Sequence, residues 1–169
     1  MKAFVLIFIS VLFLSCQSDT KTTETVADDT VSPSVFKADI EALDYVEYEL
    51  DAKAATTLSA WDKYSELSVT IAQLKSGDVS YFNNEMKVIE AFFNEFKTSM
   101  PEAVKTPSIL ARALALETKM LKLQSALHLD HASEKEQLNA VKETLVAFSN
   151  FNLQINKKFE KEAQNIVKP

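Results

Sequence analysis

The stretch TPSILARALALETKMLKLQSALHLDHASEKE, residues 106–136, decides the fold. Thr106 can cap a helix, and Pro107 suits the first helical turn, where the missing backbone donor is not needed. The leucines and alanines that follow have high helix propensity and form a wide apolar arc, which predicts a central helix ending near Leu129. Ser133 and Glu136 then form a capping box, which predicts that another helix begins immediately. The stretch therefore predicts two antiparallel helices joined by a short turn near Asp130.

The second of these helices extends to about Ile166. Its apolar residues repeat at steps of three and four, and they comprise Leu138, Val141, Leu145, Phe148, Ile155 and Phe159. Asn152 falls on the same seam. A polar residue in such a seam commonly sets the helix register or bonds a partner across the bundle. A contact with a ligand is the alternative interpretation of Asn152.

The earlier part of the chain also has helical spacing. Apolar residues from Phe36 to Lys75 predict either one long helix or two helices that meet near residue 57, with Ser59 and Asp62 as a possible cap of the second. Gly77 can adopt the left-handed conformation that ends a helix. A further helix is predicted from about Val79 to Ser99, with Asp78 as its N-cap. Together these patterns predict an all-α fold, an up-and-down bundle of about four helices over residues 35–169.

The N-terminal segment Met1–Cys16 has the features of an export signal. Lys2 precedes a short apolar run that is too short for a membrane span, which needs about 20 apolar residues. The sequence Leu12-Phe13-Leu14-Ser15-Cys16 resembles the lipobox of bacterial lipoproteins. The resemblance implies cleavage after residue 15 and acylation of Cys16, the lipid attachment residue. It divides the chain into a signal peptide (1–15), an acylated cysteine with a flexible polar tether (16–34) and the helical domain (35–169).

The residues after Cys16 bear on the location of such a lipoprotein. Gln17 is not the aspartate that retains many lipoproteins in the inner membrane, and Gln17-Ser18-Asp19 resembles short tags that direct some of them to the cell surface. These resemblances imply an exported protein, lipid-anchored to the outer membrane and facing either the periplasm or the outside. Residues 17–34 are rich in threonine, serine and aspartate and have too little apolar surface to fold.

Composition excludes several function classes. The formal net charge is −6, which disfavours nucleic acid as a partner. Cys16 is the only cysteine, so the helical domain has no disulfide and no thiolate metal site. Gly77 is the only glycine, which excludes phosphate-binding loops, dinucleotide fingerprints and the hydrolase nucleophile elbow. No cofactor motif is present, and the sequence predicts a protein that is not an enzyme.

Four groups of residues are candidates for a site or an architectural role. His128 and His131 stand three apart and could share a metal, although a position at a helix C-terminus also explains them. Arg112, the only arginine, could form a partly buried ion pair with a glutamate of the 79–99 helix. The acidic residues, which we interpret as a solvated helix face, are Asp39, Glu41, Asp44, Glu47, Glu49 and Asp51. The phenylalanines at helical spacing are more typical of a core than of a lipid or haem cavity.

A second resemblance covers residues 56–160. The order Trp61-x-x-Tyr64, Ile109 to Thr118, and Phe148-Ser149-x-Phe151-Asn152-x-x-Ile155-Asn156 is similar to small helical bacterial lipoproteins of unknown function. It implies architectural roles for Arg112 and Asn152. The leading hypothesis is a non-enzymatic envelope lipoprotein whose helical bundle binds a protein or another envelope component. The alternative is a carrier of a small ligand or metal, which would use the bundle interior or His128 and His131.

Overall fold

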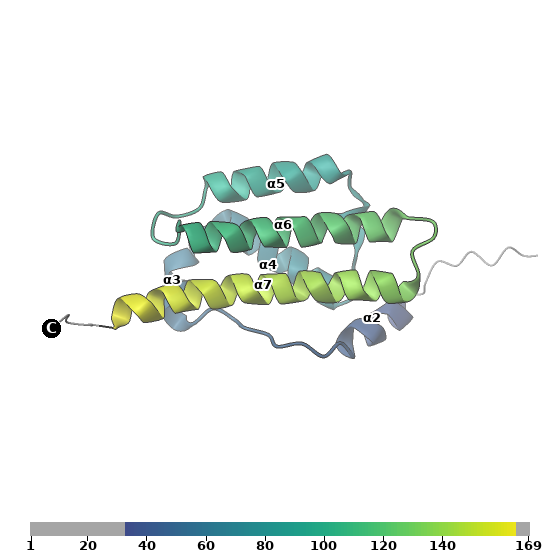
Figure 1. The fold of residues 1–169 in the computed structure, drawn as a ribbon, viewed down its shortest axis with the longest axis horizontal. Coiled ribbons are helices and arrows are strands. Elements are labelled where there is room, and N and C mark those ends of the chain that lie inside the picture. The colour runs from purple at the N-terminus through teal and green to yellow at the C-terminus, as the bar shows by residue number, and fades with distance from the viewer. Residues whose placement is uncertain (1–32, 165–169) are drawn as a thin grey trace, which may run out of the picture. The chain divides into compact units, whose positions relative to one another are not determined.

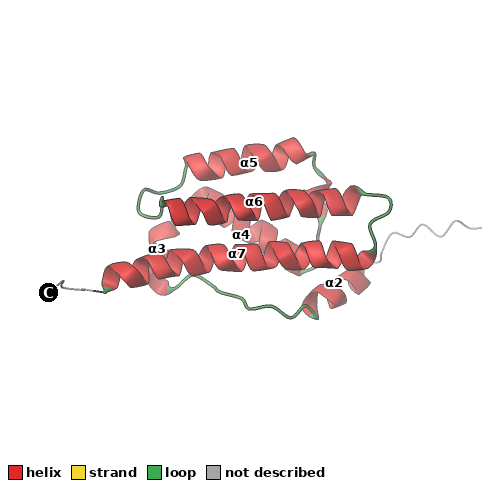
Figure 2. Cartoon of the chain, in the orientation of Figure 1, coloured by secondary structure: helices red, strands yellow, loops and turns green. Residues whose placement is uncertain are grey.

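The computed structural model describes residues 33–164, with side chains from residue 37 onward. This part of the chain is entirely helical and contains no strand, which confirms the all-α prediction (Figures 1 and 2). Its helices are α2 (Pro33–Glu41), α3 (Ala52–Leu58), α4 (Asp62–Lys75), the 3₁₀ helix η1 (Ser80–Asn83), α5 (Met86–Thr98), α6 (Pro107–His128) and α7 (Glu134–Ala163). The predicted signal peptide, Cys16 and most of the predicted tether lie outside the described residues.

Helices α6 and α7 form the centre of the bundle. They are joined by residues 129–133 and lie side by side (Figure 1). Helix α6 also packs against α5 and η1, while α7 packs against α2, α3 and α4. The α6–α7 hairpin therefore connects the N-terminal helices to the rest of the bundle, and α7 shares the central role that the sequence predicted for α6.

The capping residues act as the sequence predicted. The Thr106 hydroxyl oxygen accepts a hydrogen bond from the backbone N–H of Ile109 at 3.3 Å, and α6 starts at the next residue, Pro107. Ser133 and Glu136 form both bonds of the capping box at the start of α7. Gly77 follows α4 with a φ of 85°, the left-handed conformation expected there. The two central helices thus begin at residues that the sequence alone identifies.

The core is apolar and largely aromatic, as predicted. The indole of Trp61 lies 4.4 Å from the ring of Phe96, measured between centroids, and its N–H donates to the Ser99 hydroxyl at 3.1 Å. The phenylalanines that the sequence assigned to the core are all buried, namely Phe82, Phe92, Phe93, Phe96, Phe148, Phe151 and Phe159. Their burial supports packing as the reason for the phenylalanine spacing.

Both predicted forms of the segment from Phe36 to Lys75, one long helix or two helices that meet near residue 57, are wrong before Ala52. Helix α2 ends at Glu41, and residues 43–51 are extended and run along α7; we call this segment the strap (Figure 2). A second break separates α3 from α4 at residues 59–61, close to the predicted break near residue 57. Ser59 and Asp62 do not cap α4, because its N-cap is Trp61 without a side-chain bond. The acidic run is solvated as expected, but only Asp39 and Glu41 lie on a helix.

Side chains of α7 explain why the strap is extended. The Ser149 hydroxyl accepts from the Tyr48 N–H at 2.8 Å and donates to the Val46 carbonyl at 2.9 Å. Asn156 contacts the strap in the same manner, donating to the Glu49 carbonyl at 2.8 Å and accepting from the backbone N–H of residue 51 at 3.0 Å. These bonds satisfy strap backbone groups that a helix would otherwise pair internally.

Asn152 lies between these two residues on the same face of α7. Its side-chain nitrogen donates to the Tyr48 carbonyl at 3.0 Å, and its oxygen accepts from the Tyr64 hydroxyl at 3.0 Å. A tyrosine hydroxyl is a donor at neutral pH, and burial raises the pKa of Tyr64 further. Asn152 therefore joins the strap, α4 and α7, and this agrees with the prediction of a bond across the bundle.

The prediction of one helix over residues 79–99 is also wrong at its N-terminal end. Asp78 accepts from the N–H of Ser80 at 2.9 Å, only two residues ahead, in a turn that competes with helix capping. The 3₁₀ helix follows, and α5 begins only at Met86 after Glu85. Phe82 is nevertheless buried, because the 3₁₀ helix directs it into the core against α6.

Candidate binding groove between α6 and α7

A hollow lies on the surface along α6 and α7. It consists of two adjoining pockets, of about 660 and 400 Å³, that share Asn139 as a lining residue. We refer to them together as the α6–α7 groove. Its lining extends from Arg112 on α6 to Leu129, the residue that follows this helix, over about 25 Å at 1.5 Å per residue.

The groove has an apolar lining of mostly small side chains. Ala115 and Ala126 contribute from α6, and Val146 and Ala147 from α7. Leu129, in the loop between the helices, is 60% exposed and lines the pocket nearer that loop, together with Ala132. The lining therefore offers a bound molecule small apolar side chains that lie between longer charged ones.

Charged side chains along the groove are mostly basic. Five cations line it, against the two carboxylates of Glu136 and Glu143, so its formal charge is +3 while the whole chain carries −6. The five are Arg112, Lys119, Lys122, Lys135 and Lys142. The net charge of the groove is thus positive while that of the whole protein is negative, and a positive surface attracts anionic groups.

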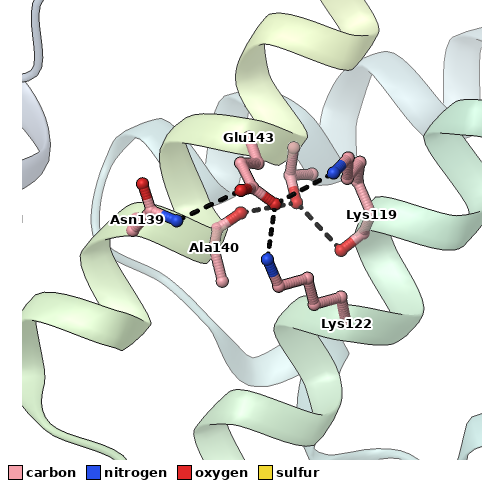
Figure 3. Close-up of polar contacts among 6 residues, drawn as sticks. Lys119, Lys122, Asn139, Ala140 and Glu143 are labelled. Carbon is pink, nitrogen blue, oxygen red and sulfur yellow. Dashed lines mark hydrogen bonds and ion pairs between the residues drawn. The ribbon is translucent and has the colours of Figure 1, made fainter.

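Glu143 binds two lysines in the middle of the groove (Figure 3). Its Oε2 atom accepts from the ammonium groups of Lys119 at 3.1 Å and Lys122 at 2.9 Å, and Asn139 donates to Oε1 at 3.1 Å. The hydrogen bonds from Lys122 and Lys119 lower the pKa of Glu143 to about 2. Thr144, next along α7, is buried and donates to the Lys119 carbonyl at 3.2 Å. This cluster fixes α6 against α7 and holds two lysines at the surface.

The other three cations of the groove have no carboxylate partner within the described residues. They are Arg112, Lys135 and Lys142, and none forms an ion pair there. Glu136, the remaining acidic group of the groove, is engaged in the capping box, where the bonds from Ser133 lower its pKa. These three cations are therefore available to a bound anionic group.

This arrangement corrects the prediction for Arg112. Its side chain is exposed and forms no ion pair with Glu85, Glu90 or Glu95. The partly buried ion pair between α5 and α6 is formed instead by Lys97 and Glu117, with 2.8 Å between Nζ and Oε2. The sequence pattern identified the correct pair of helices for such a contact but the wrong residues.

The two histidines stand at the end of α6 and in the loop after it. His128 Nδ1 lies 2.8 Å from the Gln124 carbonyl oxygen, and His131 lines the groove. Among residues 33–164 there is no group of three or more histidine, cysteine, aspartate or glutamate side chains placed to hold a metal ion. The metal-carrier hypothesis therefore gains no third ligand from the described part of the chain.

Few features of the amino-acid sequence indicate the groove. Its lysines resemble ordinary solvated residues, and only the seven-residue spacing of Arg112 with Lys119, and of Lys135 with Lys142, places them in rows along each helix. That spacing becomes informative once α6 and α7 are known to be neighbours. Cys16, the predicted lipid attachment residue, lies outside the described residues.

Comparisons of the chain with family models, curated proteins and solved structures gave no significant match. None of the helices among the described residues is both long enough and apolar enough to cross a membrane.

Proposed function

We propose that this chain is a lipid-anchored, non-enzymatic binding protein of the bacterial envelope, and that the α6–α7 groove is its binding surface. The lipobox-like sequence at Leu12–Cys16 supports the anchor. The observation that carries the binding role is the groove, since it joins apolar surface with three cations that have no carboxylate partner among the described residues. A partner of protein nature fits a surface that is shallow, elongated and about 25 Å long.

The proposed location follows from the same N-terminal residues. A lipid on Cys16 would hold the protein at the membrane, because each buried CH2 contributes about 0.8 kcal/mol and several acyl chains make the anchor durable. Gln17 favours the outer membrane over retention in the inner one. The segment from residue 17 to 32, up to the start of α2, would allow the bundle a root-mean-square distance of about 22 Å from the lipid.

The anchor is tested by metabolic labelling with a palmitate analogue. We expect the wild-type chain to be labelled and Cys16→Ala to be unlabelled. Ser10→Ala serves as a matched control, because it changes the same segment without removing the thiol. Equal labelling of Cys16→Ala and wild type would contradict the lipoprotein assignment.

The binding role is tested by photo-crosslinking in cells that express the full chain. A photoreactive residue is placed at Leu129, in the groove, and as a control at Val69 on α4; these side chains are 60% and 58% exposed. We expect a discrete crosslinked product from position 129 that is absent from position 69. The same products from both positions, or none from position 129, would contradict a role for the groove in binding.

A further inference from the structure

The charges and the shape of the α6–α7 groove indicate what it binds. We propose that the groove binds an acidic amphipathic helix of a partner protein, with an apolar stripe on the groove lining and carboxylates toward both walls. This inference rests on the proposed binding function and specifies the chemistry of the partner.

The charge of the groove favours an acidic partner. It carries +3 on a chain of net charge −6, so its basic character is local. Arg112, Lys135 and Lys142 have no carboxylate partner among the described residues, and a partner's carboxylates would supply one. Charge complementarity of this kind raises the rate of encounter and fixes the orientation of a complex.

The geometry favours a helix over an extended peptide. Arg112 and Lys119 stand seven residues apart on α6, and Lys135 and Lys142 stand seven apart on α7, a rise of about 10.5 Å in each case. A third helix lying along the groove repeats its own side chains at nearly the same interval. Acidic residues spaced by seven on one flank of that helix would therefore face Lys135 and Lys142, and an acidic residue on the other flank would face Arg112. The alanines between these cations allow close approach.

The same features disfavour a compact phosphate or a lipid headgroup. Tight phosphate sites bring several donors to one point, whereas the three cations without a carboxylate partner come from separate positions on two helices. The one place where two lysines converge is already occupied by the Glu143 carboxylate, with Nζ–Oε2 distances of 3.1 and 2.9 Å. A bound phosphate would have to displace that carboxylate or lie beside it.

The test is a selection of displayed random 20-residue peptides on the mature chain, residues 16–169, with Cys16→Ser to keep it in solution. We expect the enriched peptides to be acidic, with apolar residues at helical spacing and carboxylates seven apart. The double variant Lys135→Glu/Lys142→Glu should bind the enriched peptides about tenfold more weakly or worse. The matched control Lys87→Glu/Lys161→Glu has the same total charge, and we expect nearly wild-type affinity because both lysines are exposed outside the groove.

Several results would overturn the inference. These are enrichment of neutral or basic peptides, no enrichment at all, or equal losses in the groove and control variants. Vesicles of phosphatidylglycerol and phosphatidylcholine and inorganic phosphate are assayed in parallel. Binding of either that is lost only in the groove variant would assign the groove to headgroups or phosphate instead.

Failure of this inference can be distinguished from failure of the proposed function. If position 129 captures a partner in cells and that capture persists in Lys135→Glu/Lys142→Glu, the groove binds but not through these charges. If position 129 captures nothing, the binding function itself fails.

Discussion

Replacing Asn152 by alanine should destabilise the fold through the contact between the strap and the bundle. The substitution removes two hydrogen bonds of 3.0 Å, to the Tyr48 carbonyl and from the Tyr64 hydroxyl. A net hydrogen bond contributes about 1 kcal/mol, and leaving a partly buried partner unpaired costs about 1 kcal/mol more. We therefore expect a loss of about 3 kcal/mol in the free energy of unfolding and a fall of about 9 °C in the melting temperature.

The assay is urea and thermal unfolding of the mature chain, followed by far-ultraviolet circular dichroism. Asn150→Ala is the matched control, because Asn150 lies on the same helix, is half-buried and forms no side-chain hydrogen bond within the described residues. The control should change stability by less than about 0.5 kcal/mol. A loss in Asn152→Ala no greater than that of Asn150→Ala would refute the reasoning.

A double-mutant cycle then isolates one of the two bonds. Tyr64→Phe removes the hydroxyl while leaving a ring to stack on Phe148, whose centroid lies 6.2 Å away. We expect Tyr64→Phe and Asn152→Ala to be coupled by about 1 kcal/mol. Strictly additive effects would show that the hydroxyl and the amide do not interact in solution.

Three other outcomes follow from local geometry. Gly77→Ala should lower the free energy of unfolding by about 2 kcal/mol, because φ is 85° and the added Cβ would lie 3.0 Å from the Lys37 Cβ. A decrease below about 0.5 kcal/mol in chemical unfolding would contradict this. Ser133→Ala should cost about 1 kcal/mol by removing the cap of α7, whereas Ser133→Thr, which retains the hydroxyl, should keep most of the stability; equal melting temperatures for the two variants would count against the capping role. The pKa of Glu143 is lowered to about 2, so the stability it contributes is present at neutral pH and is lost as pH falls from about 5 toward 2. Over that interval the free energy of unfolding of Glu143→Gln should therefore fall by up to about 1 kcal/mol less than that of wild type. Urea titrations at a series of pH values measure this difference. Identical pH profiles would show that the contacts between Glu143 and the two lysines do not stabilise the fold.

The parts of the fold that could be predicted are those with local signals. Helices α6 and α7 carry an N-cap, a proline in the first turn, a capping box and a sustained apolar repeat, and both formed where expected. Gly77 is a similar case, because the left-handed conformation that it adopts strongly favours glycine. In each instance the determining contact joins residues within a few positions of one another.

The strap could not be predicted in this way. Leu43, Val46 and Leu50 have helical spacing, but Val46 is 66% exposed and the segment is held by residues more than a hundred positions away. The informative feature was the set of polar residues on α7 at 149, 152 and 156. Only Asn152 was recognised, because the other two are unremarkable until the strap is placed beside them. The groove could not be predicted for the same reason. The cations on α6 and on α7 border a common groove only because the two helices pack side by side.

The manner in which the strap is held has an evolutionary consequence. Ser149, Asn152 and Asn156 contact its main chain, not its side chains, so the hydrogen bonds do not depend on which amino acids the strap contains. Val46 and Tyr48 are 66% and 39% exposed, which leaves these positions free to vary. Related chains should therefore diverge at these exposed strap positions while retaining the three polar residues of α7. Deep mutational scanning should likewise show that positions 46 and 48 tolerate more substitutions than positions 149, 152 and 156.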